Sequence, residues 1–495
     1  MIMSLVYIFF GGGLLFSLAA LWFVLWKKEK DFEFVFILLY VIGLFQGIID
    51  KVVAISSVLP TSTIWGPLKY SLLLLMIGGT SLRLIRKKRF IINTGMKIWI
   101  GVFVLTWGMF AALMIEARSA EPRFLPTNTL QNYGIVNMLM CVIVYLNVKQ
   151  THINTFLKIL TWSGIVAALV GVVQIILGPV RLVSMGINVL DANSFASLAA
   201  DDVGEGFVNL LRTFSFFASH HGFSAFLIIA IMGLQVLRFS RNVTKRSSVI
   251  GMTIMWIGMA TTFNLTNILF CTMTLMLFVY LHYTNATLAL QRIFLRKTFW
   301  KTILLILVIL PIVLATVEPV RKRVFGAFDF REGAQSAGGS LYLRHIYISN
   351  GIQALMNHPL GLGLNLSVIN NSKYDMKGYS RGDYFSEQNL GFSADCWFLW
   401  LFVQLGVFGF LLYILCFLIP IIWGWSQREK IANAESMILF YGLLSLLVFT
   451  IIAGISNSPT LVYSPSNLLI WAAAGLLMKV PSWQTNNSQT IKTSG

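Results

Sequence analysis

Long apolar runs with few charges recur from one end of the chain to the other, and they constrain the fold more than any other feature. A bilayer-spanning helix needs ~20 mostly apolar residues, and it pairs its backbone polar groups internally. Hydrophobic residues make up 57% and charged residues 11% of the 495-residue chain, which suffices for about a dozen such helices. Soluble domains carry roughly 25% charged residues, so a soluble enzyme is excluded, as are disordered and collagen-like chains. We predict an all-α polytopic membrane protein.

The apolar runs predict about thirteen transmembrane helices. We expect them near residues 3–26, 33–49, 64–82, 96–115, 133–148, 157–178, 223–238, 249–264, 267–283, 299–317, 396–423, 436–454 and 466–479. The first run is too long for the apolar core of a signal peptide and has lysines after it, so we expect a retained span.

Two long connections divide the chain into five parts. We expect N-terminal transmembrane helices over 1–178, a first long extracytoplasmic loop over 179–222 and central helices over 223–317. A second long extracytoplasmic loop then covers 318–395, and residues 396–495 form C-terminal helices and a cytoplasmic tail.

The net charge of +18 is distributed unevenly along the chain. In a soluble protein it would suggest nucleic acid, but cytoplasmic loops of membrane proteins collect Lys and Arg, so no nucleic acid partner is predicted. The basic clusters occur in alternate connections, which places the N-terminus outside and the C-terminus in the cytoplasm. The four cysteines show neither disulfide nor zinc spacing, and no metal or cofactor is predicted.

Some arginines do not follow this charge rule, because they lie in the two loops predicted to be outside. Arg181 and Arg212 belong to the first loop, and the second carries Arg321, Arg323, Arg331, Arg344 and Arg381. Charge inside the spans is nearly absent, whereas channels, pumps and ion-coupled carriers usually keep a working charge there. This distribution favours chemistry at the outer membrane face over transport through the middle.

The first loop ends in an Arg followed by aromatic residues and a His pair. Arg212 precedes Thr213–Phe217, and His220 and His221 stand directly before an apolar span. A guanidinium group offers fixed donors suited to phosphate or diphosphate, and His can donate, accept or titrate near neutrality. The alternative is that Arg212 reaches lipid headgroups and the His residues only cap the span.

The second loop holds further polar motifs. Arg344 and His345 open a predicted helical stretch that runs to Met356. The sequence Asn-His-Pro-Leu-Gly-Leu-Gly follows it and includes His358. Pro and alternating Gly predict a tight turn with close backbone approach. Asp395 stands at the mouth of the next span, where it is either a general base or the N-cap of that helix.

These motifs resemble the O-antigen polymerase/O-antigen ligase superfamily of bacterial membrane glycosyltransferases. The resemblance rests on Arg212 before an aromatic segment, the Arg344 helix, the HPLGLG element, and a polar residue entering a span that ends in LG-x-x-G. It covers about 205–410, and the rest of the chain agrees in topology only. It implies a C-type glycosyltransferase-like fold in the bacterial cytoplasmic membrane, acting without cofactor or metal.

The resemblance also implies substrates and roles. The donor would be an oligosaccharide on undecaprenyl diphosphate, with Arg212 and Arg344 binding the diphosphate. Ligases of the family typically have His-Asn where this chain has Asp395-Cys396, and Pro-Asn is common where it has His220-His221. The catalytic base is therefore Asp395, His220 or His221.

Other loop residues are expected to bind glycan or fix the loops; they are Arg321, Arg323, Arg381, His345, His358 and Glu387. The predicted function is a polymerase of surface polysaccharide repeat units. The alternatives are a ligase that moves glycan to lipid A core or protein, and a flippase or exporter of lipid-linked sugars. The expected partners are lipid-linked oligosaccharides, membrane lipids and a chain-length regulator.

Overall fold

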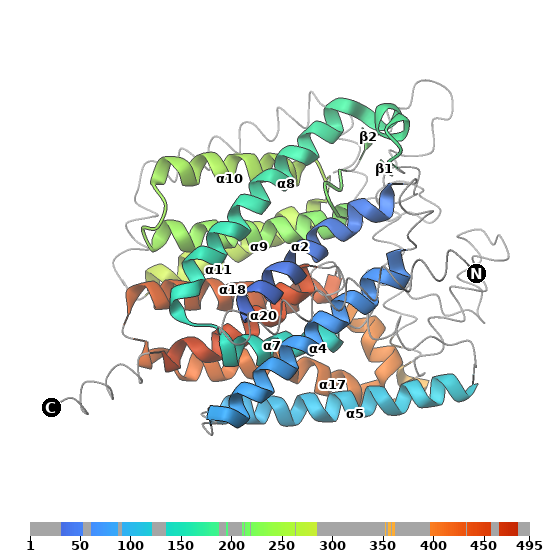
Figure 1. Ribbon diagram of the computed structural model, residues 1–495, viewed down its shortest axis with the longest axis vertical. Helices are drawn as coiled ribbons and strands as arrows, with labels where there is room; N and C mark the ends of the chain where they lie inside the picture. The colour runs from blue at the N-terminus through green and yellow to red at the C-terminus, as the bar shows by residue number, and fades with distance from the viewer. Residues whose placement is uncertain are drawn as a thin grey trace.

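The computed structural model describes part of the chain, and this part folds into a bundle of long helices (Figure 1). The described residues are 31–52, 61–87, 92–120, 135–187, 195–196, 210–211, 213–217, 219–262, 264–284, 352, 355–357, 359–361, 397–431, 433–456 and 465–483. The elements are α2 (Asp31–Lys51), α4 (Thr61–Lys87), α5 (Thr94–Ala120), α7 (Ile135–Asn147), α8 (Gln150–Ser184), β1 (Phe195–Ala196), β2 (Leu210–Leu211), α9 (His220–Phe239), α10 (Lys245–Ala260), α11 (Leu265–Thr284), α17 (Trp397–Ser426), η3 (Arg428–Lys430), α18 (Ala434–Ser456), α20 (Ser466–Lys479) and η4 (Val480–Ser482).

The helices agree with an all-α polytopic membrane protein. Six of them, within the described ranges, are long and apolar enough to cross a membrane; they lie in Thr94–Ile115, Gln150–Ser184, His220–Phe239, Thr266–Tyr283, Leu401–Ser426 and Ala434–Gly454. Every predicted span in the described part of the chain overlaps a helix. The predicted spans 3–26 and 299–317 lie outside the described residues, so the total of thirteen stays a prediction.

Short connections sort the helix termini into two ends of the bundle. The turns between α9 and α10 and between α10 and α11 are only a few residues long, so these three helices alternate in direction (Figure 1). Asn242, after α9, donates to Asn154 near the start of α8 at 3.3 Å. We call this the Lys149 end, after the residue before α8, and the opposite one the His220 end, after the first residue of α9.

Basic residues of the described helices gather at the Lys149 end. The turn from α9 to α10 carries Arg238, Arg241, Lys245 and Arg246, and the link from α17 to α18 carries Arg428 and Lys430. The C-terminal part of α4 lies at the same end, because Asn147 of α7 donates to Thr80 of α4 at 2.8 Å. One end of the bundle is thus basic, as the charge rule predicts for a cytoplasmic face.

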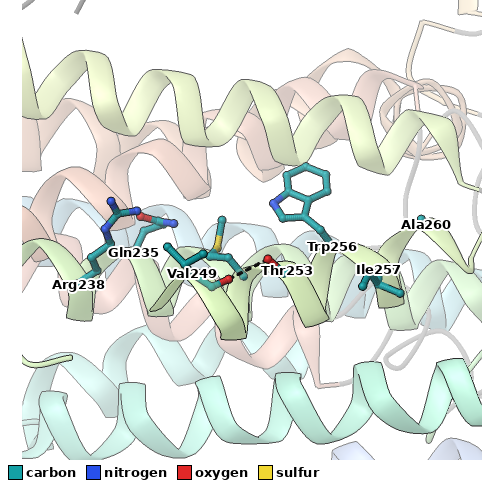
Figure 2. A pocket seen from close by; sticks show the side chains of 8 residues that line it. Gln235, Arg238, Val249, Thr253, Trp256, Ile257 and Ala260 are labelled. Atoms are coloured by element: carbon teal, nitrogen blue, oxygen red, sulfur yellow. Dashed lines mark hydrogen bonds between the residues drawn. The ribbon is translucent and has the colours of Figure 1, made fainter. Parts of the chain in front are cut away.

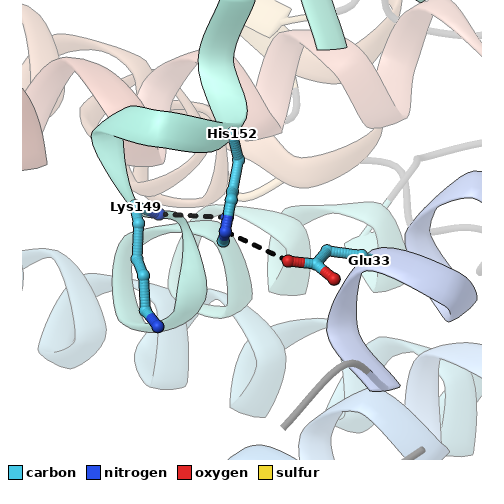
Figure 3. Close-up of polar contacts among 3 residues, drawn as sticks. All are labelled: Glu33, Lys149 and His152. Atoms are coloured by element: carbon cyan, nitrogen blue, oxygen red, sulfur yellow. Dashed lines mark hydrogen bonds and ion pairs between the residues drawn. The ribbon is translucent and has the colours of Figure 1, made fainter. Parts of the chain in front are cut away.

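An ion pair fastens α2 to α8 at the Lys149 end (Figure 3). His152 Nε2 lies 3.0 Å from Glu33 Oε1, and the side chains are 29% and 41% exposed. The His152 ring also faces the backbone N–H of Lys149, 3.4 Å from its Nδ1. The contact is open to solvent on both sides.

Small residues let the central helices pack closely. A Cβ built on Gly164 of α8 would lie 2.5 Å from the Cβ of Ala230 in α9, and one on Gly258 of α10 would lie 2.5 Å from that of Ala168. Such small-residue contacts replace the hydrophobic driving force that lipid does not provide. They bring α8, α9 and α10 together as one unit.

Helix α8 extends further than its predicted span. The expected span ends at Gly178, before Pro179, but the helix continues to Ser184 after a local break at Gly178, where φ is 70°. Pro is well suited to the first turn of a helix, so a new helical segment begins there. The helical segment from Pro179 to Ser184 thus falls within the predicted first loop, 179–222.

Candidate active site

The His pair begins α9 at the His220 end. Ser219 is the N-cap, and its side chain accepts a hydrogen bond from the backbone N–H of Gly222 at 3.2 Å. His220 is 3% exposed and His221 is half-buried, with ring centroids 3.9 Å apart. The Ser cap sets where α9 starts and thereby places both imidazoles in its first turn.

A buried polar network joins these imidazoles to α11. Asn264 Nδ2 lies 2.8 Å from His221 Nδ1, and Asn264 also caps α11 through its Oδ1, which accepts from Asn267 N at 3.1 Å. The Asn267 side chain donates to Ser224 Oγ at 2.6 Å, and Ser224 donates to the His220 carbonyl at 2.9 Å. Amides, a hydroxyl and a ring nitrogen from two helices thus fix one arrangement of the His pair.

The segment that precedes α9 is clamped by a single side chain. Gln174 of α8 is 4% exposed; its Oε1 accepts from the backbone N–H of Phe214 at 3.2 Å and of Ser215 at 2.9 Å. Its Nε2 donates to the Ser215 carbonyl at 3.0 Å, and Ser215 Oγ donates to the Ala167 carbonyl at 2.8 Å. Ser215 has φ 50°, a left-handed conformation that these bonds hold in place.

The same segment is also bonded to α10. Thr213 and Thr261 bring their hydroxyl oxygens to 2.6 Å, and Thr213 N donates to the Thr261 carbonyl at 3.2 Å. Since Arg212 directly precedes Thr213, the chain beside the predicted diphosphate ligand is held between α8 and α10. Arg212 itself lies outside the described residues.

A turn of the second long connection crosses α17 where that helix is broken. Gly406 has φ 66° and interrupts α17, and the next amide, Val407 N, donates to the Pro359 carbonyl at 3.0 Å. A Cβ on Gly361, where φ is 93°, would lie 2.5 Å from both Gln404 O and Gly406 N. The predicted close approach at the Pro-Leu-Gly turn is confirmed, and its partner is the other glycine motif.

Gln404 lies at this crossing, where its backbone carbonyl faces Gly361. It is 4% exposed, and its Oε1 has no hydrogen-bond partner among the described residues. A buried polar atom without a partner costs free energy, so this position is specified by something other than apolar packing.

The structure describes two of the predicted site residues, His220 and His221, and brings them together. The others lie outside the described residues; they are Arg212, Arg344, Asp395, Arg321, Arg323, Arg381, His345, His358 and Glu387. Their roles stay predictions. Within the described ranges, no group of three or more His, Cys, Asp or Glu side chains could hold a metal ion.

The sequence prediction missed Gln174, Asn264 and Asn267. Asn264 falls inside a predicted span, 249–264, although it is the N-cap of the next helix. The polar sequence Thr261-Thr262 before it was the available signal, because Thr and Asn favour the ends of helices over their interiors. Gln174 lies in an otherwise apolar run, and only the fold shows what it contacts.

An open groove is lined by residues of α9 and α10 (Figure 2). Its lining is mostly apolar, with Trp256 in the middle and Arg238 at the Lys149 end. Thr253 there donates to the Val249 carbonyl of its own helix at 3.0 Å. Apart from Arg238 the lining residues carry no ionisable group, so the lining offers no general base for group transfer.

Comparison with known protein families identifies one matching region. The chain is similar to the O-antigen ligase family over residues 250–414. This confirms the resemblance to the O-antigen polymerase/ligase superfamily in that part of the chain. The matched region contains Arg344, the Pro359–Gly361 turn, Asp395 and the break at Gly406, as well as Asn264. No curated protein matched the chain.

The match fits the geometry. Family members are glycosyltransferase-like enzymes of surface polysaccharide synthesis, and the described helices suit a membrane protein. The region begins in α10 and ends in α17, so it spans both glycine motifs that meet in the fold. Thr213 and His221 precede this region in the chain, and they contact it through Thr261 and Asn264.

Proposed function

We propose that this protein polymerises oligosaccharide repeat units carried on undecaprenyl diphosphate into a surface polysaccharide. The family match over residues 250–414 carries this proposal, because it supplies the reaction class. The basic Lys149 end supports a cytoplasmic location for that face, with the N-terminus outside and the C-terminus inside. The His220 end then faces outward from the bacterial cytoplasmic membrane, where lipid-linked repeat units and a chain-length regulator meet the enzyme.

The reaction needs charge stabilisation and one proton acceptor. The bond between the sugar C1 and the diphosphate oxygen breaks, a hydroxyl oxygen of the acceptor glycan bonds to C1, and the diphosphate leaves with the electron pair. Arg212 and Arg344 stabilise the diphosphate as its charge develops. Asp395, His220 or His221 takes the proton of the acceptor hydroxyl. The clamp by Gln174 supports this assignment, since it fixes the chain next to Arg212.

Ligation is the second candidate, because the matched family is described as O-antigen ligase. A polymerase is favoured because ligases of the superfamily typically have His-Asn at the mouth of the span where this chain has Asp395-Cys396. The two functions differ in the cell. Loss of a ligase leaves long polymer unattached, whereas loss of a polymerase leaves single repeat units.

Arginine substitutions test the proposal. Arg212→Ala and Arg344→Ala, expressed in a deletion strain, are expected to abolish long polymer while the protein stays in the membrane. Arg428→Ala is the matched control, since Arg428 is an arginine of the Lys149 end. The measurement is the length profile of surface polysaccharide on a gel. Normal chain length in both loop variants would exclude the proposed role of these arginines.

A further inference from the structure

The hydrogen bond between Asn264 and His221 reveals which nitrogen of the imidazole carries the proton. The orientation of the Asn264 amide is settled by the cap of α11, because the backbone N–H of Asn267 can only donate. The atom facing that N–H, at 3.1 Å, is therefore the oxygen Oδ1. The amide nitrogen Nδ2 is then the atom that faces His221 Nδ1 at 2.8 Å.

An amide nitrogen has hydrogens and no lone pair to offer, so His221 Nδ1 must accept. A neutral imidazole that accepts at Nδ1 carries its hydrogen on Nε2. The doubly protonated ring would set an N–H against the hydrogens of Asn264 and lose this bond. Every further contact of Nε2 is consequently made as a donor.

The position of His221 in α9 favours the same neutral form. His221 is the second residue of the helix, and the N-terminal end of a helix disfavours a cation. The centroid of the His220 ring lies 3.9 Å away. Two positive charges this close repel each other, so the two imidazoles disfavour being protonated together. Ser224 holds the backbone of both residues through their carbonyls, at 2.9 and 3.1 Å.

We infer that His221 is a hydrogen-bond donor and not the general base: its Nε2–H binds an oxygen of the donor diphosphate, and Asn264 is the positioning residue that fixes this tautomer. The inference rests on the proposed function and deepens it. The proton of the acceptor hydroxyl then goes to Asp395 or His220, while the diphosphate leaves with the electron pair of the broken C1–O bond. A neutral donor adds a directed hydrogen bond to the leaving group, next to the charge that the proposed arginines supply.

Two isosteric substitutions separate a donor from a base. In His221→Gln the amide nitrogen reaches the place of Nε2 and still donates, whereas in His221→Asn it reaches only the place of Nδ1. We expect His221→Gln to keep transfer within about threefold of the native rate and His221→Asn to lose about tenfold or more, the worth of a hydrogen bond to a charged group. Equal loss in both variants would identify His221 as a base and overturn the inference.

A double-mutant cycle tests the role of Asn264. Asn264→Ser keeps an N-cap for α11 but removes the amide nitrogen that faces His221. In the native background we expect it to lower transfer about tenfold, because the tautomer is no longer fixed. In the His221→Gln background it should have little further effect, since Gln donates without help from Asn264. Equal effects in both backgrounds would show that Asn264 serves only the helix.

Binding of undecaprenyl diphosphate without glycan separates this inference from the proposed function. The native protein in detergent is expected to bind it, His221→Gln to bind comparably, and His221→Asn to bind about tenfold more weakly. If the native protein does not bind it, the proposed donor class is wrong. If all three proteins bind equally while their transfer rates differ, His221 donates its hydrogen bond to another part of the substrate. The assignment to the diphosphate is then overturned. Membrane levels and thermal unfolding midpoints confirm that each variant is folded.

Discussion

The two ends of the helix bundle use polar groups in opposite ways. At the His220 end, amides, hydroxyls and imidazoles are mostly buried and bonded across α8, α9, α10 and α11. At the Lys149 end the charged side chains lie at helix termini, and the ion pair of Glu33 with His152 is open to solvent (Figure 3). Both ends border the same apolar core.

This difference separates topology from chemistry. Exposed basic residues at one end need no precise geometry to orient a protein in a membrane, because orientation depends on how many Lys and Arg lie near the span ends. Buried uncharged groups at the other end lose free energy unless each finds its partner, so their presence indicates selection for an exact arrangement of donors and acceptors. Substitutions at the two ends should therefore differ in cost, in the order that follows.

The largest effect is expected at the crossing of the two glycine motifs. Gly361→Ala adds a Cβ 2.5 Å from Gln404 O and Gly406 N, on a residue with φ 93°. Backbone strain and overlap together should destabilise the fold by more than about 4 kcal/mol and abolish polymer. Gly78→Ala in α4 is the control, since nothing lies within 4 Å of its Cβ. Thermal unfolding in detergent measures both, and a stable Gly361 variant would contradict this contact.

The Gln174 clamp comes next. Gln174→Leu leaves the buried amides of Phe214 and Ser215 without their acceptor, which should cost about 3 kcal/mol. Polymer length should fall as well, because the chain next to Arg212 is released. Gln150→Leu, at the Lys149 end, removes only a 3.2 Å bond to Ser436 and should cost less than about 1 kcal/mol. Equal unfolding midpoints for the two variants would remove the distinction between the ends.

A smaller loss is expected between the hydroxyl groups of Thr213 and Thr261. Thr213→Val removes the 2.6 Å bond and should lower the unfolding free energy by about 1 kcal/mol, since Thr261 still donates to the Gly258 carbonyl. Thr253→Val is matched in chemistry, but its hydroxyl bonds only its own helix on the exposed face of α10 (Figure 2). That control should leave the unfolding midpoint unchanged. A larger effect there would assign a structural role to the groove.

The smallest effect belongs to the ion pair at the Lys149 end. Glu33→Gln should cost less than about 1 kcal/mol, because the contact with His152 is exposed to solvent and Gln still offers an acceptor oxygen. A loss as large as that of Gln174→Leu would show that the Lys149 end is organised as tightly as the other.

Apolar periods and charge clusters were enough to place the described helices. Turn chemistry predicted the close approach at Gly361, because Pro followed by Gly limits the backbone to a few conformations. The break at Gly406 was not predicted, since glycine is common in membrane helices and is usually tolerated there. The role of this break is visible only from its contact with Pro359, which is distant in the sequence.

The network around the His pair could not be predicted from the sequence for a related reason. His220 and His221 are adjacent in the chain and were identified as candidates, but Asn264 contacts His221 only because α9 and α11 pack side by side. Side-chain amides leave no periodic signal, and their partners are set by tertiary packing. Tautomer assignment in particular requires the orientation of an amide, which no sequence pattern contains.

The contact between the Pro359–Gly361 turn and the break in α17 also bears on how the protein can diversify. It fixes the chain at Gly361 about 12 Å along the helix from Trp397, at a rise of about 1.5 Å per residue. For a chain segment that joins two fixed points, each doubling of its length adds only ~0.6 kcal/mol of closure entropy. Insertions and deletions between Gly361 and Trp397 should thus cost little stability, as long as the contact of the Pro359–Gly361 turn with α17 is kept.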